Sequence, residues 1–335
     1  MTEVVALLDE LQRIGKLVDG YLEPQLARRR PARLWEAAYH LPKAGGKRLR
    51  PFFTINVCKA LGGREEDALP PAVAIELIQA FSLVHDDIID RDSTRRGVPT
   101  VHKKWGVPTA IVAGDLLHIK AYDIVTKAAL TNQRLARVLP NIIDEINRST
   151  IEICEGQELD EELERKLQPT ESEYFEMISK KTAALFEAST AVGAQAAEST
   201  SEAVESMREF GQALGIAFQI VDDILGVTAD EKELGKPVGS DIREGKRTLL
   251  VIHTLTKGSC QERKSLLKAL GNRKATARDS STATKALISS GAVEYSRRKA
   301  REYTEKARTA LLTLPESDYR TLLDNALTFV VKRTY

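Results

Sequence analysis

Four aspartates lie close together directly after an apolar stretch, at Asp86, Asp87, Asp90 and Asp92. On a helix, side chains four residues apart share one face, so Asp86 and Asp90 would lie together and repel each other. A bound cation would offset this repulsion, and a set of carboxylates favours a hard ion such as Mg²⁺. A solvated, salt-bridged helix end is the alternative interpretation of so short a motif.

A second pair of aspartates, Asp222 and Asp223, follows another apolar stretch that also contains Gln219. If both stretches are helices that face each other in a bundle, their acidic ends meet and form a divalent-metal site. Mg²⁺ binds few protein oxygens and completes its shell with water and substrate phosphates, so a diphosphate is the expected counter-ligand. The apolar walls behind the aspartates would hold a hydrocarbon tail.

Basic residues gather in short segments, and the glycine- and lysine-rich loop 227–248 has a composition that suits phosphate binding, although it lacks the spacing of a P-loop. These segments are 45–51, 95–97, 180–182 and 227–248. In the first, Lys47, Arg48 and Arg50 repel one another unless an anion is near. A solvated basic turn is the alternative for this group.

Apolar residues recur at helical spacing through most of the chain, and no sustained alternating pattern is present, so an all-α fold is expected. The predicted helices cover residues 3–20, 24–42, 51–62, 67–91, 108–131, 134–160, 171–194 and 199–226, followed by four or five helices in 246–335. A loop is expected at 92–107 and a low-complexity turn near 277–285.

Some polar residues within these helices are interpreted as structural. Asp115, His118 and Asp123 are expected to be satisfied core or rim groups rather than ligands. The acidic end of helix 134–160 is expected to be solvated. Gln157 and Asp160 share one face of that end, which leaves a role in a pocket open.

Length and composition are compatible with one domain over residues 1–335. The chain has 49 basic and 48 acidic residues, so no global charge indicates nucleic acid or an anionic membrane as a partner, and any electrostatic function must be local. Cys58, Cys154 and Cys260 are scattered, as in proteins with reduced thiols. No signal peptide and no membrane span are expected, which favours a cytoplasmic location.

The chain resembles the trans-isoprenyl diphosphate synthases of the polyprenyl synthetase family over nearly its whole length. The resemblance rests on five ordered motifs: GGKRLRP, QAFSLVHDDIIDRDSTRRGVPTVH, KKTAALF, FQIVDDILG and GKPVGSDIREGKRT. It implies an all-α, single-domain bundle of about 12–15 helices around a central apolar cavity, the isoprenoid synthase type. It also implies a homodimer.

By that resemblance, each motif supplies residues of one active site. The Mg²⁺ cluster would be held by Asp86, Asp90 and Asp222, with support from Asp87 and Asp223. The allylic diphosphate would be bound by Arg95, Lys181, Lys236 and Lys246. Isopentenyl diphosphate would be bound by Lys47, Arg50, Gln79 and Arg96. The polar groups near the carbocation would be Thr182 and Gln219.

The implied reaction joins isopentenyl diphosphate to dimethylallyl, geranyl or farnesyl diphosphate. The allylic C–O bond ionises, the double bond of isopentenyl diphosphate attacks the cation, and a proton leaves to the released diphosphate. One position departs from many relatives: the second acidic motif ends in Gly226 where they have aspartate. In this it resembles archaeal short-chain synthases.

Product length is expected to depend on Phe81 and Ser82, one helical turn before Asp86. One aromatic residue beside a small one resembles enzymes that make geranylgeranyl diphosphate. For the product, farnesyl diphosphate or a mixture of the two is the alternative. For Phe81, the alternative is that it is an ordinary core residue with no role in product length. A class I terpene cyclase and a non-catalytic subunit are rival functions, against which both acidic motifs and GGKRLRP count.

Overall fold

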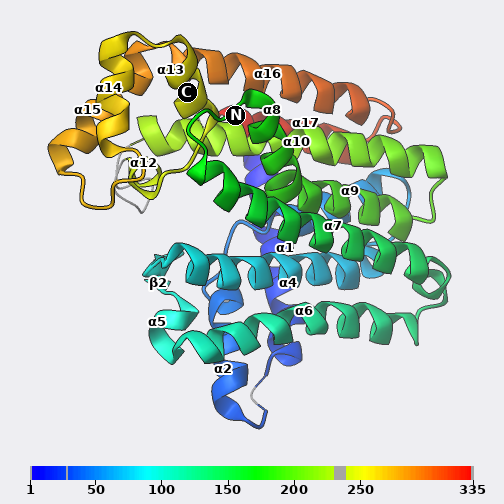
Figure 1. The fold of residues 1–335 in the computed structure, drawn as a ribbon. Helices are drawn as coiled ribbons and strands as arrows, with labels where there is room; N and C mark the ends of the chain where they lie inside the picture. The colour runs from blue at the N-terminus through cyan, green and yellow to red at the C-terminus, as the bar shows by residue number, and fades with distance from the viewer. Residues whose placement is uncertain (1, 28, 230–238, 333–335) are drawn as a thin grey trace. The chain divides into compact units, whose positions relative to one another are not determined.

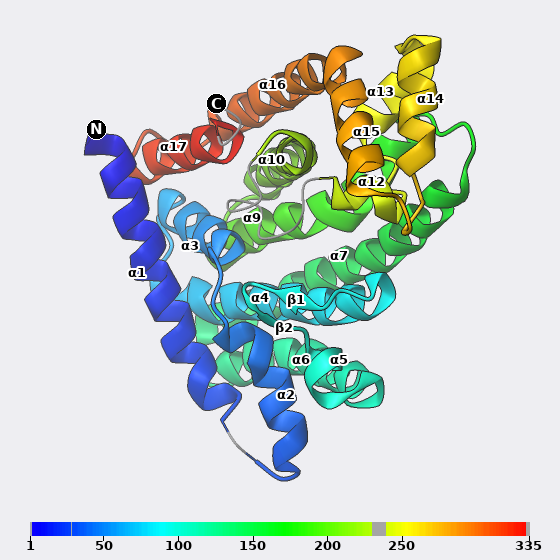
Figure 2. The same ribbon diagram turned by 90° about the vertical axis from the view of Figure 1, so that its left-hand side faces the viewer.

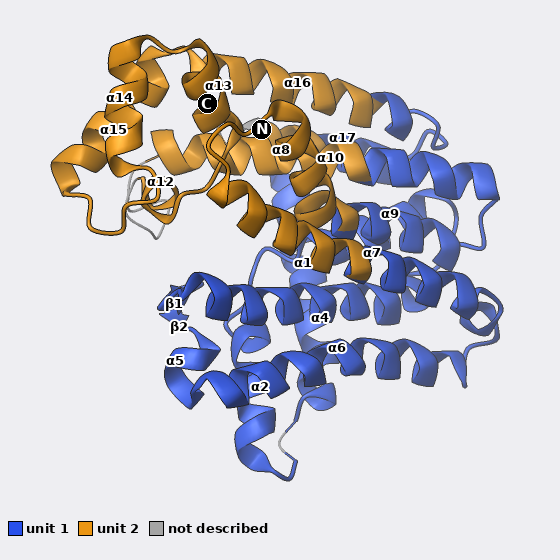
Figure 3. Cartoon of the chain, viewed as in Figure 1, with its two compact units in different colours: residues 1–150, 185–211, 309–326 blue, residues 151–184, 212–308, 327–335 orange. Residues whose placement is uncertain are grey.

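The computed structural model describes residues 2–27, 29–229 and 239–332, which are helical apart from short connections and one two-stranded pair (Figure 1). The chain divides into two compact units, shown in different colours in Figure 3. Unit 1 comprises Met1–Thr150, Leu185–Gly211 and Thr309–Ala326. Unit 2 comprises Ile151–Ala184, Gln212–Arg308 and Leu327–Tyr335.

Unit 1 contains the helices of the amino-terminal region: α1 (Thr2–Gln25), α2 (Ala32–Lys43), α3 (Leu49–Ala60), α4 (Glu65–Asp90), α5 (Val101–Trp105) and α6 (Val107–Ala129). Between α4 and α5, strand β1 (Thr94–Arg95) pairs antiparallel with β2 (Val98–Pro99). The unit also includes most of α9 (Ala184–Ala196) and parts of four helices, α7 (Gln133–Arg165), α10 (Ser201–Thr228), α16 (Ala292–Leu311) and α17 (Asp318–Lys332).

Helix α4 carries the first acidic motif, and it packs against α3 and α6 (Figures 1 and 2). Its residues from Ala72 to Ile78 are all buried, and all of them except Glu76 are apolar, as expected for a helix in the core. Acidic residues in its first turn complement the positive end of the helix dipole. The helix ends at Asp90 because Arg91 adopts a left-handed conformation, with φ of 62°. The chain then turns into β1.

The core of unit 1 is built around the buried ring of Phe53. Three other rings meet it nearly edge to face, those of Phe52, Phe186 and Phe210, with centroids 5.4, 6.2 and 5.9 Å away. Such pairs stabilise a core by about 0.5–1.5 kcal/mol each beyond the burial of their area. These rings bring α3, α9 and α10 together within unit 1.

Unit 2 contains the rest of α7, α10, α16 and α17 together with six shorter elements: α8 (Glu171–Ile178), the π-helical turn η1 (Ser179–Ala183), α12 (Ser240–Glu244), α13 (Leu249–Lys257), α14 (Cys260–Ala269) and α15 (Ala277–Ser289). Its core joins Ile220 and Ile224 of α10 to Leu250 of α13 and Leu266 of α14, all fully buried. Helices α14 and α15 lie side by side as a hairpin (Figures 1 and 2).

Most predicted helices are confirmed to within a few residues. Residues 67–91 form α4, 108–131 form α6 and 199–226 form α10. The described part of 246–335 contains the five helices α13 to α17, at the upper end of the expected number. The all-α fold class is therefore confirmed.

The predicted helix 24–42 was wrong at its start. Helix α1 continues to Gln25, and α2 begins only at Ala32. Pro31 caps α2 in an extended conformation. A proline disfavours the helical conformation of the residue before it, here Arg30, which is consistent with the start of a separate helix after Pro31.

The predicted low-complexity turn near 277–285 was also wrong, because these residues begin α15. Thr276 and Asp279 form a capping box at its start, with the Thr276 hydroxyl 3.1 Å from the Asp279 amide. This arrangement satisfies backbone donors that would otherwise favour a turn. The predicted loop 92–107 holds, besides its connections, the β1–β2 pair and α5.

Two helices, α4 and α10, are long and apolar enough to cross a membrane by length and composition, contrary to the expectation that no run would be. However, 67% of the most apolar window of each is buried within the structure. Core helices of water-soluble proteins have the same property, so these two helices are weak evidence for a span. The thiols of Cys58, Cys154 and Cys260 are free, and that of Cys58 is buried.

Candidate functional site

The acidic end of α4 is held by Arg95, which β1 places beside it. One guanidinium nitrogen of Arg95 lies 2.6 Å from Asp87, 3.2 Å from Asp92 and 3.4 Å from Asp86. Asp87 is buried, whereas Asp86 and the terminal Asp90 are half-buried. The structure therefore brings Arg95 to the aspartates that were predicted to bind metal.

Burial and this arginine have opposite effects on Asp87. Burial raises the pKa of the Asp87 carboxyl to about 6, although the charge and hydrogen bond of Arg95 act to lower it. Burial alone would lower the pKa of Arg95, but the neighbouring carboxylates raise it above its usual value. The charge of Arg95 therefore favours the ionised form of Asp87 and opposes the effect of its burial.

The carboxylates at this end of α4 suit a hard cation. Oδ2 of Asp87 is buried and accepts no hydrogen bond within the described part of the chain, and a buried oxygen without a donor is suited to a metal ligand. Among the described residues, however, no three carboxylate, imidazole or thiolate groups converge as a complete metal site. The donor set fits Mg²⁺ in type, and the predicted ligand set stays a prediction.

Two turns of unit 1 meet through Arg96, one of the predicted isopentenyl diphosphate ligands. Its guanidinium donates to the carbonyl of Gly45 and lies 3.9 Å from the carboxylate of Glu76. A Cβ on Gly46 would stand 2.9 Å from that guanidinium, so a side chain there would displace it. Lys47 follows Gly46 and is exposed. The structure thus brings the predicted residues Lys47 and Arg96 to neighbouring positions.

The other two cations of this segment differ in their surroundings. Arg48 is buried, 2.5 Å from Glu76 and 2.7 Å from Asp19, so the protein itself supplies the anion that this cation requires. Arg50 is half-buried, with its guanidinium 4.2 Å from the centre of the Phe186 ring. Arg48 therefore already has two carboxylate partners, the buried Glu76 and the exposed Asp19.

Gln79 and Ser82 lie on α4, one turn apart and half-buried. The Ser82 hydroxyl donates to the backbone carbonyl of Gln79 over 3.0 Å. Serines often bond backward in this way within helices. This hydrogen bond uses the backbone of Gln79 and not its side-chain amide. The role of that amide in binding isopentenyl diphosphate stays a prediction.

Phe81 belongs to an aromatic cluster between α4 and α6. Its ring stacks on His118 at 4.9 Å and meets His85 edge to face at 5.0 Å. His85 in turn lies 3.0 Å from the carbonyl oxygen of Ile111, and a Cβ on Gly114 would stand only 2.2 Å from the imidazole. His118 is a packing residue, as expected, but its contact with Phe81 was not anticipated.

In unit 2, two predicted diphosphate ligands converge on one carboxylate. Lys181 lies 2.6 Å and Lys246 2.9 Å from Asp160, and Lys246 lies 2.8 Å from Glu164. Burial alone would raise the pKa of Asp160, but the two ammonium groups lower it below its usual value. Asp160 is an exception to the expected solvated helix end, because it is buried against these lysines. A role in a pocket, the other interpretation open for this residue, is compatible with its position.

A π-helical turn positions Lys181. Residues 171–194 were predicted to form one regular helix, but η1 interrupts it at Ser179–Ala183. A Cβ on Gly156 of α7 would stand 2.2 Å from the backbone nitrogen of Lys181, so the glycine allows the two backbones to approach. Single π turns often occur at functional sites, because they redirect side chains.

A chain of hydrogen bonds connects four side chains of unit 2. Thr182 donates to the Gln219 carbonyl oxygen, Gln219 donates to Asp223, and the Tyr174 hydroxyl donates to the other Asp223 oxygen, each over 2.8 Å. The chain fixes the orientation of the Gln219 amide. Both oxygens of Asp223 are engaged by protein donors, whereas its neighbour Asp222 is half-buried.

The pKa values of this chain follow from its burial. Burial raises the pKa of Asp223 to about 7, although the hydrogen bonds from Tyr174 and Gln219 act to lower it. Burial, with the charge of Asp223 adding to it, also raises the pKa of Tyr174 well above its usual value. Tyr174 was missed by sequence reasoning, because a tyrosine in a predicted helix gives no signal of its partner.

Gly226, where many relatives have aspartate, faces another carboxylate. A Cβ at this position would stand 2.9 Å from Oδ2 of Asp241. Asp241 therefore places a carboxylate beside the position at which the missing side chain would begin. Of the predicted site residues, Lys236 lies outside the described residues.

Known proteins are similar to this chain over most of its length. A model of the family described as polyprenyl synthetase matches residues 31–287. Geranylgeranyl diphosphate synthase of Sulfolobus acidocaldarius is 49% identical over 277 residues, which are 82% of this chain and 82% of that protein. Geranylfarnesyl diphosphate synthase of Aeropyrum pernix is 41% identical over 90% of this chain and 95% of its own.

Solved structures show the same similarity. The crystal structure of geranylgeranyl pyrophosphate synthetase from Pyrococcus horikoshii has a TM-score of 0.88 and 44% identity, and the match covers 97% of this chain and 98% of that one. The structure of a polyprenyl synthase from Caulobacter crescentus, complexed with calcium and isoprenyl diphosphate, has a TM-score of 0.87 and 30% identity, with 98% of each chain covered.

Proposed function

Because this chain belongs to the polyprenyl synthetase family, we propose that it is a trans-prenyltransferase that joins isopentenyl diphosphate to dimethylallyl, geranyl and farnesyl diphosphates. The observation that carries this proposal is the end of α4. There, an apolar helix ends in Asp86, Asp87 and Asp90, beside Arg95. An anionic head group with a hydrocarbon tail is the substrate that such a surface fits.

Magnesium is the proposed cofactor, with Asp86, Asp90 and Asp222 as ligands and Asp87 and Asp223 in support. When bound, it supplies a Lewis acid that favours departure of the diphosphate. The carboxylates are the chain's contribution, because oxygen donors without sulfur suit this ion. The calcium in the Caulobacter crescentus structure is consistent with a hard divalent ion.

The cations of the chain bind and orient the two diphosphates. Arg95, Lys181 and Lys246 are proposed to bind the allylic diphosphate, together with Lys236. Each of the first three now pairs with a carboxylate, at 2.6–2.9 Å. On binding, each would exchange a carboxylate for a phosphate oxygen, which stabilises the negative charge that develops on the leaving group.

The second substrate and the cation are held by other groups. Isopentenyl diphosphate is proposed to bind Lys47, Arg50, Gln79 and Arg96. The fixed dipoles of Thr182 and Gln219, which are hydrogen-bonded to each other, would face the allylic cation. Preorganised dipoles stabilise a developing charge without a cost of reorientation. The proton lost in condensation would go to the released diphosphate, so no side-chain base is required.

Geranylgeranyl diphosphate is the proposed product, with Phe81 limiting the length of the tail. The ring is backed by His118 and His85, which hold it against displacement by a growing chain. Replacement of Phe81 by alanine should therefore lengthen the product by at least one isoprene unit, as measured by chromatography of the dephosphorylated alcohols. An unchanged product distribution would reject this role.

The proposed activity is tested with purified protein. It is incubated with isopentenyl diphosphate, Mg²⁺ and each allylic primer in turn, and the chain length of the product is measured. Geranylgeranyl diphosphate as the main product is the expected result. A cyclised terpene, or no product with any primer, would overturn the proposal, and a geranylfarnesyl product would correct its chain length.

A cytoplasmic homodimer is proposed as the working form. In support, α6 exposes Ile111 and Ile119, eight residues apart on one face, at 44% and 62%. Exposed apolar side chains along a helix are typical of association surfaces. Light scattering should report a dimer, and Ile119→Lys should convert it to a monomer. A monomeric wild-type protein would contradict this assignment.

A further inference from the structure

The segment 257–285, here named the basic hairpin, concentrates positive charge. It comprises the end of α13, α14 and the first part of α15. Of the 49 basic and 48 acidic residues in the chain, eight and two lie here, which leaves 41 and 46 elsewhere. The hairpin is therefore strongly positive, while the remainder of the chain is net negative. None of the residues proposed for catalysis lies in it.

The two acidic residues of the hairpin, Glu262 and Asp279, accept hydrogen bonds at the first turns of α14 and α15. Glu262 accepts hydrogen bonds from Ser259 in a capping box and from the Ser289 hydroxyl at 2.6 Å. Asp279 accepts from the Thr276 hydroxyl, also at 2.6 Å. Neither carboxylate forms an ion pair with a hairpin cation among the described residues. The Thr276 hydrogen bonds and then the charges of Lys268 and Arg278 lower the pKa of Asp279, so this carboxylate offsets part of the positive charge. With eight basic residues against two acidic ones, the hairpin stays net positive.

The outer face of α14 combines cations with an apolar side chain. Cys260, Arg263, Lys264, Leu267 and Lys268 line one surface hollow, and their spacing places them on a single face of the helix. Leu267 is 59% exposed. Leu266 and Ala269, on the opposite face, are fully buried and pack α14 against the core of unit 2. The exposed leucine is thus not needed for the core.

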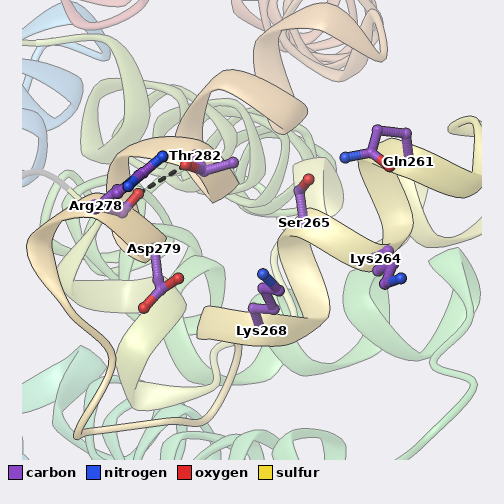
Figure 4. Close-up of a pocket in the computed structure, with 7 residues that line it drawn as sticks. All are labelled: Gln261, Lys264, Ser265, Lys268, Arg278, Asp279 and Thr282. Atoms are coloured by element: carbon purple, nitrogen blue, oxygen red, sulfur yellow. Dashed lines mark hydrogen bonds between the residues drawn. The ribbon is translucent and has the colours of Figure 1, made fainter.

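A second hollow, of about 470 Å³, lies between α14 and α15 (Figure 4). Helix α14 contributes Lys264 and Lys268, which also line the first hollow, and α15 contributes Arg278. The remaining lining is polar and consists of Gln261, Ser265, Asp279 and Thr282. Cations, hydroxyls and an amide are groups that donate hydrogen bonds to phosphate oxygens.

We propose that the basic hairpin docks the protein on the surface of a bilayer that contains anionic phospholipids. Leu267 would enter the head-group region, while Arg263, Lys264, Lys268 and Arg278 bind lipid phosphates. Helices that lie on membranes combine an apolar contact with lysine and arginine in this way, and their binding depends on anionic lipid. The charge of the hairpin is complementary to such a surface, whereas the charge of the rest of the chain is not.

Nucleic acid fits the hairpin less well. The segment contains no phenylalanine, tryptophan or tyrosine on which bases could stack. An exposed leucine between cations also has no counterpart on a phosphate backbone. A bilayer surface accommodates both features of α14, so it is the partner that the surface favours.

Docking has a consequence that rests on the proposed function. A prenyl diphosphate with a long tail partitions into membranes, because each buried methylene contributes about 0.8 kcal/mol. A synthase held at the bilayer surface would release such a product where it is most soluble. Binding itself needs no turnover, so docking and catalysis can be tested separately.

The test uses the full-length protein and sedimentation with vesicles. Wild-type protein should bind vesicles that contain phosphatidylcholine and phosphatidylglycerol. It should bind vesicles of phosphatidylcholine alone much more weakly. The triple variant Arg263→Glu, Lys264→Glu, Lys268→Glu should bind the anionic vesicles roughly a hundredfold more weakly, since each surface cation contributes about a factor of five. Leu267→Ser should weaken binding severalfold while keeping all the charges.

A charge-matched control separates the hairpin from general electrostatics. Lys16→Glu, Lys43→Glu, Lys103→Glu changes net charge equally, at exposed positions of unit 1, and should keep most of the binding. Equal loss in both triple variants would overturn the proposal, as would equal wild-type binding to neutral and anionic vesicles. Binding to single-stranded RNA but not to vesicles would also overturn it.

Two further measurements keep the outcome unambiguous. Circular dichroism and thermal unfolding of the hairpin variant should match wild type, because the substituted side chains are exposed. Its turnover in solution without vesicles should be unchanged. Loss of vesicle binding with intact turnover supports docking, whereas an inactive wild-type protein that still binds vesicles would count against the proposed function alone.

Discussion

The aspartate pairs Asp86–Asp87 in unit 1 and Asp222–Asp223 in unit 2 are identical as dipeptides but differ in their partners. Asp87 is paired with the cation of Arg95. Asp223 is held by two neutral donors, Tyr174 and Gln219. Burial raises the pKa of both carboxyls, to about 6 for Asp87 and about 7 for Asp223. A charged partner and a pair of neutral donors are thus two ways to accommodate a buried aspartate.

This difference separates two kinds of support for a ligand site. Next to Asp86, an arginine balances charge and would have to exchange partners when a diphosphate binds. Next to Asp222, a hydrogen-bond chain through Asp223 orients Gln219 and Thr182, and its donors among the described residues are neutral. The same sequence pattern therefore supports charge exchange in one unit and orientation of neutral dipoles in the other.

The largest expected effect is loss of turnover in Asp86→Ala and in Asp222→Ala. Each should lower turnover at least ~10²–10³-fold, the range seen when a group that stabilises transition-state charge is removed. Both variants should retain the helical circular dichroism of wild type. The matched control is Asp115→Ala, an exposed carboxylate on α6, which should keep full activity. Wild-type rates in Asp86→Ala would remove the basis for the assignment.

Replacement of Arg95 by alanine tests the charged pairing. It leaves the buried Asp87 without a cation, so the free energy of unfolding should fall by about 3 kcal/mol. Urea denaturation measures this change. Addition of Asp87→Asn should recover part of the loss, because the uncompensated charge is then absent. Arg137→Ala, which breaks an exposed pair with Glu198, should have no measurable effect.

The neutral pairing is tested with Tyr174→Phe, which removes one donor from the buried Asp223. A loss of about 2 kcal/mol in the free energy of unfolding is expected, since a buried acceptor loses its partner. The control is Tyr295→Phe, whose hydroxyl donates to the half-buried Glu171 at 2.6 Å and should matter less. Equal effects in both variants would show that burial is not the cause.

The smallest effect concerns acid stability through Asp160. Its folded pKa is lowered by Lys181 and Lys246, despite burial, so the unfolded state takes up a proton first as pH falls. The interaction of Asp160 with the two lysines therefore stabilises the fold at pH values above the ordinary aspartate pKa of about 3.9. This contribution is lost as the pH falls below that value. Asp160→Asn should be less stable at neutral pH, with a shallower decline in acid. Parallel pH profiles for both proteins would contradict the pairing.

Much of this protein follows from local sequence. The period of apolar residues predicted α4, α6 and α10 closely, because it reflects which face of each helix is buried. Boundaries failed where short-range chemistry competes with periodicity, as at Pro31 and in the capping box of Thr276. The ordered motifs indicated the family without any contact being known.

Partners of charged groups were decided only by the tertiary structure. Arg48 pairs with Asp19 and Glu76, which are 29 and 28 residues away. Asp160 is buried between two lysines, although its sequence context indicated solvent. Electrostatic interaction depends on distance in space and on burial, and neither can be obtained from spacing along the chain.

The sequence by itself determined which residues could do chemistry: carboxylates at the ends of apolar helices and cations in the turns. The tertiary structure decided which of them are already paired, which are buried, and where a glycine such as Gly156 allows a π turn to place Lys181. Helical periodicity is a local property of the chain. Pairing, burial and close approach arise only when distant segments pack together.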